Sequence, residues 1–163
     1  MASLLLRPGR DADLPAIFEI TRQSFAGLAK GRYSPAQLAA WMDGCGPETY
    51  REGVEAGRIQ VAELDGAVVG YVDFGPGEVT RLFVLPSAAG RGIGTRLLRI
   101  GIRAARKGHD GPVVLESLLN AVGFYEKQGF VATAKGFSSQ GTAETPPIEV
   151  VIMALPPTAS DHR

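Results

Sequence analysis

The sequence predicts a single α/β domain, with a mixed central sheet of about seven strands flanked by helices. Its 163 residues are a typical length for one domain. Three consecutive strand-like segments lie in the middle of the chain and favour antiparallel pairing, whereas the strand–helix–strand order over 78–117 predicts a parallel crossover. We expect the domain to span 1–155 and a flexible tail to follow over 156–163.

Turn and capping residues place the elements of the first half of the chain. Ser34 and Pro35 have the pattern of a helix start, with a capping serine followed by a proline in the first turn. Asp65 and Gly66 supply the positive φ angles that a tight hairpin turn requires. We therefore expect a strand over 4–7, helices over 14–27 and 35–44, and paired strands over 59–64 and 67–74.

The second half of the chain alternates between strands and helices. An apolar strand is closed by Pro86, and after a glycine-rich stretch the apolar residues recur at helical spacing. We expect a strand over 78–85, a helix over 92–107, a strand over 112–117, a helix over 120–128, strands over 130–134 and 148–155, and a polar loop over 136–147.

Composition excludes several classes of function. Seventeen basic residues balance seventeen acidic ones, so no general electrostatic affinity for nucleic acid or an anionic membrane is indicated. One cysteine and two histidines exclude a disulfide framework and leave little for a metal site. No apolar run approaches the ~18 residues of a membrane span, and the start lacks the pattern of a secretory signal. The sequence predicts a soluble, cytoplasmic protein without a metal.

The segment between the strand that ends at Pro86 and the following helix is suited to bind a pyrophosphate. Its glycines at 90, 92 and 94 let the backbone approach a ligand closely, and the helix N-terminus adds partial positive charge. Six basic residues and no acidic one lie within 90–107; a solvated cationic helix face is the alternative explanation. The spacing matches neither a P-loop nor a dinucleotide-binding fingerprint.

Two stretches resemble the GCN5-related N-acetyltransferase (GNAT) superfamily. Val84-x-Pro86 followed by Gly-Arg-Gly-Ile-Gly-Thr over 90–95 and an apolar helix is similar to the acetyl-CoA signature of that family. Residues 117–130, which include Phe-Tyr-Glu-Lys-Gln-Gly-Phe, resemble a second family segment. They lie in the family's order and at its usual separation. The resemblance implies the GNAT fold, acetyl-CoA as the acetyl donor and a primary amine, in a small molecule or a peptide, as the acceptor.

The resemblance also implies which residues contact the cofactor. The chain departs from the family at Ala89, where glutamine or arginine is usual, so that the backbone must do more of the phosphate binding. The family's asparagine often precedes the tyrosine by seven residues, whereas here it precedes it by five. The implied cofactor-binding residues are Leu82, Phe83 and Val84 for the pantetheine arm, Gly90, Arg91, Gly92, Ile93, Gly94 and Thr95 for the pyrophosphate, and Asn120.

The resemblance makes Tyr125 the general acid that returns a proton to the coenzyme A sulfur. Glu78 is the candidate general base, because a glutamate four residues before the first pantetheine-contacting position has that role in one branch of the family. Period-two alternation would place Glu78 on the same face as Leu82. Glu116 and Glu149 are alternative bases, each on a strand of its own.

The acceptor is the part of the function that the sequence defines least. Acidic residues outnumber basic ones seven to two within 45–78, which could favour a cationic amine or could be surface scatter. Residues 30–50 are expected to help form the acceptor wall, and a homodimer is left open. The competing functions are a non-catalytic acyl-CoA-binding module and a mononucleotide-binding domain, of which the second fits poorly with three consecutive central strands.

Overall fold

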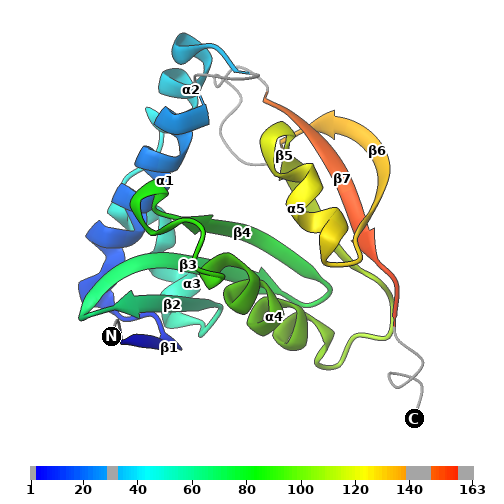
Figure 1. Cartoon of the computed structure of the whole chain (residues 1–163), viewed down its shortest axis with the longest axis horizontal. Coiled ribbons are helices and arrows are strands. Elements are labelled where there is room, and N and C mark those ends of the chain that lie inside the picture. The colour runs from blue at the N-terminus through cyan, green and yellow to red at the C-terminus, as the bar shows by residue number, and fades with distance from the viewer. Residues whose placement is uncertain (1–2, 29–32, 139–147, 158–163) are drawn as a thin grey trace.

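The computed structural model describes residues 3–28, 33–138 and 148–157. They form one seven-stranded mixed sheet with the strand order β1-β2-β3-β4-β5-β7-β6 (Figure 1), which confirms the predicted fold class. The pairing is antiparallel throughout except between β4 and β5, where it is parallel. The strands are β1 (Leu4–Pro8), β2 (Ile59–Leu64), β3 (Ala67–Gly75), β4 (Glu78–Val84), β5 (Val113–Leu118), β6 (Val131–Phe137) and β7 (Glu149–Leu155).

Helices cover both faces of the sheet. Helices α1 to α3 pack on one face, and α4 and α5 pack on the other. The helices are α1 (Leu14–Leu28), α2 (Pro35–Met42), α3 (Arg51–Glu55), α4 (Ile93–Arg106) and α5 (Val122–Lys127). Within the described residues, none of these helices has both the length and the apolar character that crossing a bilayer requires.

The expected elements are present, with two differences. Helix α3 was not expected, because its five residues are too few to show a helical period. The expected loop over 136–147 begins too early, because β6 continues through Phe137 by pairing with β7. The hairpin turn between β2 and β3 is confirmed, since Asp65 and Gly66 have φ angles of 52° and 87°. Residues 139–147 and most of the expected tail lie outside the described residues.

Helix α4 packs closely against β3 at Gly101, and this contact helps to position its N-terminus. A Cβ atom added at Gly101 would lie 2.9 Å from Cγ2 of Val72. Leu97 and Leu98 on the same side of the helix are fully buried. Only glycine allows this close approach, which holds the start of α4 beside the end of β4.

A β-bulge interrupts β4. Asp73 of β3 pairs with Arg81, whereas the next β3 residue, Phe74, pairs with Val79. Thr80 is therefore the extra residue of the bulge. Since side chains alternate between faces along a strand, one extra residue reverses the alternation on either side of it.

The bulge changes which β4 side chains share a face. Leu82 and Val84 pack into the core beneath α4, and Phe83 packs toward α1. Val79, on the other side of the bulge, also packs into the core beneath α4. Glu78 therefore faces the opposite side. The expectation that Glu78 shares a face with Leu82 is wrong, because the extra residue of the bulge, Thr80, lies between them and reverses the alternation.

Strands β4 and β5 meet at one end and then separate. Their pairing consists of Glu78 opposite Val114, near the start of each strand. From there β5 continues as the partner of β7, while β4 stays paired with β3. Figure 1 shows the two parts of the sheet diverging from this junction. The C-terminal half of β4 therefore has one strand edge that is not paired with β5.

Candidate active site

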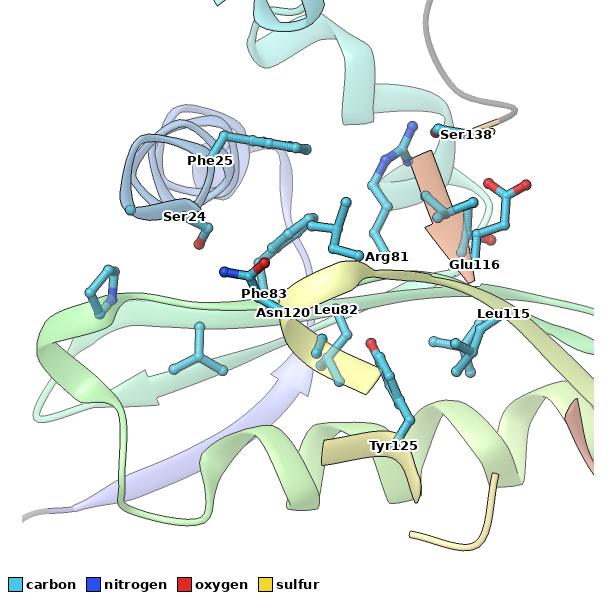
Figure 2. Close-up of a pocket in the computed structure, with 18 residues that line it drawn as sticks. Ser24, Phe25, Arg81, Leu82, Phe83, Leu115, Glu116, Asn120, Tyr125 and Ser138 are labelled. Atoms are coloured by element: carbon cyan, nitrogen blue, oxygen red, sulfur yellow. The ribbon is translucent and has the colours of Figure 1, made fainter. Parts of the chain in front are cut away.

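A pocket lies where β4 and β5 separate (Figure 2). Its walls come from α1, from β4, from the end of β5 and from the short turn that precedes α5. Most of the side chains that line it are apolar or uncharged, as is usual for a small-molecule site. The pocket brings together six of the candidate site residues predicted from the sequence, namely Leu82, Phe83, Val84, Glu116, Asn120 and Tyr125.

The glycine-rich loop has the backbone conformation that anion binding requires. Gly90 and Gly92 have φ angles of 80° and 76°, in the left-handed region that favours glycine. Gly92 is the N-cap residue of α4, whose first turn contains no acidic residue. The N–H groups of a helix's first turn have no intrahelical partners, so they are free to bind an anion. Together these observations fit a pyrophosphate at residues 90–95.

The glycine-rich loop lies beside the pocket. A Cβ atom added at Gly94 would lie 3.6 Å from Cζ of Phe124 and 3.8 Å from Cγ2 of Val84. Val84 lines the pocket, and Phe124 precedes Tyr125 in α5. A molecule whose phosphates lie on the loop can therefore place its other end in the pocket.

Tyr125 is almost fully buried and lines the pocket from the α5 side. Its ring packs edge-to-face against Phe124 and Phe130, with centroid distances of 5.2 and 5.8 Å. Figure 2 shows its hydroxyl pointing into the pocket, and among the described residues this hydroxyl has no hydrogen-bond partner. Burial raises the pKa of Tyr125 well above its usual range. The hydroxyl is therefore protonated at neutral pH.

The three glutamates predicted as candidate bases lie in different places in the structure. Glu116 lines the pocket that also contains Tyr125, and the two residues come from opposite sides of it (Figure 2). Glu78 lines a neighbouring hollow together with Asp73, and Arg81 lines both the pocket and this hollow. Glu149 is exposed at the start of β7 and does not line the pocket. Tyr125 and Glu116 are thus brought together, whereas Tyr125 and Glu78 are not.

Sequence reasoning missed Arg81, the one cation among the described residues that line this pocket. Its Nη1 donates a hydrogen bond of 2.6 Å to Oδ2 of the buried Asp73, and its guanidinium lies 5.3 Å from the centre of the Tyr50 ring. Burial raises the pKa of Asp73, and the charge of Arg81 opposes that rise. A lone arginine within the apolar run over 79–85 was the signal in the sequence, because a cation is costly on a buried strand face unless it is paired.

The acceptor side of the pocket differs from the expectation. None of the described residues within 33–50 lines the pocket; Ser24, Phe25 and Gly27 of α1 form that wall instead. Lys30 lies outside the described residues. None of the seven acidic residues within 45–78 lines the pocket either.

A protein-family model described as an acetyltransferase (GNAT) domain matches residues 29–146, which is more than half of the chain. The chain belongs to the GNAT family. This GNAT protein is an acetyl-CoA-dependent N-acetyltransferase, as the resemblance in its sequence predicted, and acetyl-CoA is its cosubstrate. The Escherichia coli (strain K12) protein named "Uncharacterized N-acetyltransferase YafP" is 23% identical to it over 130 residues, which are 80% of this chain and 83% of that protein.

Solved structures of GNAT proteins share the fold of this one. A GCN5-related N-acetyltransferase from Rhodopseudomonas palustris has a TM-score of 0.83 at 24% identity, over 94% of this chain and 96% of that one. PaiA N-acetyltransferase from Thermoplasma acidophilum, crystallised with coenzyme A, has a TM-score of 0.74 at 21% identity, over 94% and 99% of the two chains. YncA of Salmonella typhimurium, a putative acetyltransferase in complex with acetyl-CoA, has a TM-score of 0.68 at 24% identity, over 94% of each chain.

Proposed function

We propose that this GNAT protein transfers the acetyl group of acetyl-CoA directly to a primary amine, in a small molecule or a peptide, while both substrates are bound. One observation supports this most strongly. The pocket between β4 and β5 has a protonated tyrosine, Tyr125, on one side, a carboxylate, Glu116, on the other, and the phosphate-binding loop beside it. Direct transfer requires acetyl-CoA and the amine to be bound next to each other. This pocket has room for the reacting ends of both.

Acetyl-CoA, when bound, supplies an acetyl group activated as a thioester. The loop amides over 90–95 would hold its pyrophosphate. The backbone of Leu82, Phe83 and Val84 would bind the pantetheine arm as an added strand, because β4 has no β5 partner along this edge. A main-chain N–H near Val84 would polarise the thioester carbonyl, and one such donor contributes roughly 3–4 kcal/mol in acyl transfer.

Two side chains would move the protons. Tyr125 would donate a proton to the departing sulfur, since its hydroxyl is protonated at neutral pH and points into the pocket. Glu116 would accept the proton of the incoming amine, directly or through one water. An accepting group is needed because an alkylammonium has a pKa near ~10.4 and is mostly protonated at neutral pH. The assignment of Glu78 as the base stays a prediction from the family resemblance. Glu78 lies across the bulge from Leu82 and does not line this pocket.

Paired glutamine variants test which carboxylate is the base. We expect Glu116→Gln to lower kcat/KM for an alkylamine at least ~100-fold near neutral pH, the low end for a positioned acid or base. The loss should shrink as the pH rises toward the amine pKa, since more of the amine then arrives neutral. Glu78→Gln is the matched control and should stay within ~3-fold of wild type from pH 6 to 9. The opposite ranking of the two variants would make Glu78 the base.

An assay of coenzyme A thiol release with a panel of amines tests the proposed function. The panel should contain alkylamines, amino acids and short peptides with free N-termini, so that it separates a small-molecule acceptor from a peptide acceptor. We expect turnover with at least one class, at a rate well above acetyl-CoA hydrolysis without amine. Tight acetyl-CoA binding with no turnover of any amine would instead identify a non-catalytic acyl-CoA-binding module.

A further inference from the structure

We propose that Arg81 selects acceptor amines that carry a carboxylate a few bonds from the amino group. The inference rests on the proposed function and adds to it a class of acceptor. It would make this GNAT protein an N-acetyltransferase of small amino carboxylates rather than of simple alkylamines or polyamines.

The pocket has two charged side chains among the described residues that line it, and they differ in sign. Arg81 comes from β4 and Glu116 from β5, and both lie on the side of the pocket away from Tyr125 (Figure 2). An acceptor on that side meets one cation and one carboxylate. If Glu116 receives the ammonium group, Arg81 is the partner for a negative group elsewhere in the same molecule.

Arg81 is held in place by its surroundings. Asp73, which is buried, accepts a hydrogen bond from one guanidinium nitrogen, and the ring of Tyr50 lies under the guanidinium. Within the described residues, this leaves most of the guanidinium N–H groups without a hydrogen-bond partner. A pre-oriented guanidinium with free donors favours a planar carboxylate, which it is able to bind through two parallel hydrogen bonds.

The charges around the pocket do not favour a cationic acceptor. None of the acidic residues of the 45–78 segment lines the pocket. Asp73 is paired with Arg81 from outside it, and several others pair with arginines that do not line the pocket, as in Glu48–Arg51, Glu52–Arg58 and Glu63–Arg7. A diamine bound with one ammonium at Glu116 would bring its second ammonium toward Arg81, which would repel it. A plain alkylamine would leave the remaining donors of Arg81 without a partner.

The test compares acceptors that differ only in the carboxylate. Glycine, β-alanine and 4-aminobutyrate are assayed against methylamine, ethylamine and propylamine, with 1,4-diaminobutane as the cationic member. We expect the best amino carboxylate to exceed its matched alkylamine at least ~10-fold in kcat/KM, as for a hydrogen-bonded charge pair. Arg81→Gln should lower kcat/KM for that carboxylate about 10- to 100-fold, mostly through KM, and change the alkylamine less than ~3-fold.

Two further variants separate recognition from folding. Arg81→Gln leaves Asp73 buried opposite a neutral side chain, whereas Arg81→Gln combined with Asp73→Asn removes both charges and keeps polar partners. The double variant should be as stable as wild type or nearly so, and should lose the carboxylate preference equally. Asp73→Asn alone keeps Arg81 and should keep the preference. Melting temperature and acetyl-CoA affinity are measured for every variant.

A binding measurement keeps this inference separate from the proposed function. With coenzyme A bound, the best amino carboxylate should raise the melting temperature of wild type but not of Arg81→Gln. Turnover of alkylamines without any preference for carboxylates, or a preference that survives in Arg81→Gln, would overturn the role of Arg81. If no amine is turned over, the proposed function fails, and the thermal shift still decides the inference: no shift, or an equal shift in the variant, overturns it.

Discussion

Gly94→Asp is expected to weaken acetyl-CoA binding at least ~100-fold without destabilising the protein. Gly94 lies in the first turn of α4, where the loop amides would hold the pyrophosphate. A carboxylate ~5 Å from one phosphate charge costs about 3 kcal/mol at an effective dielectric constant of ~20, which corresponds to more than ~100-fold in affinity. The same carboxylate stabilises the helix N-terminus by roughly 0.3–1 kcal/mol. Titration calorimetry with coenzyme A and a thermal melt measure the two effects.

Gly94 is a better position for this test than Gly92. A side chain at Gly94 would meet Phe124 and Val84 at ordinary van der Waals distances, whereas Gly92 has a φ of 76° that strains any other residue. Gly94→Asn is the matched control, because it has the shape of aspartate without the charge, and it should bind coenzyme A within ~10-fold of wild type. Equal affinity in the two variants would place the pyrophosphate elsewhere.

The parts of the site that depend on local sequence could be predicted. The conformation of the loop glycines follows from a short motif, because backbone conformation at a helix start is set by nearby residues. Tyr125 was found through the resemblance of residues 117–130 to the family, and it lines the pocket. The hairpin at Asp65 was predictable for the same reason. These features need no knowledge of which strands are neighbours.

The parts of the site that depend on pairing between distant strands could not be predicted from the sequence. The bulge at Thr80 exists only in the register of β4 against β3, and it decides that Glu78 and Leu82 face different sides. The role of Arg81 as a pocket residue depends on Asp73 in β3 and on Tyr50 beside α3. Glu116 enters the pocket because β5 leaves β4 after one pair. No local pattern in the sequence indicates which residues of two distant strands are paired.

Tyr125→Phe is expected to lower kcat at least ~100-fold while leaving stability and acetyl-CoA affinity nearly unchanged. The change removes only the hydroxyl, so the ring contacts with Phe124 and Phe130 are kept. Because that hydroxyl has no partner among the described residues, its loss leaves no described polar group without a hydrogen bond. Its loss does remove the proton donor proposed for the departing thiolate. Steady-state rates and a thermal melt measure the two effects on one sample.

A second tyrosine of the same sheet provides the contrasting control. The hydroxyl of Tyr71 is fully buried on the α1 side and lies 2.7 Å from Oγ1 of Thr21. Tyr71→Phe should therefore cost about 0.5–1.5 kcal/mol of stability and leave kcat within ~3-fold of wild type. The two variants delete the same atom from two buried rings and should affect opposite properties. If Tyr125→Phe behaved like Tyr71→Phe, losing stability and keeping turnover, Tyr125 would be a packing residue and the proton donor would lie elsewhere in the pocket.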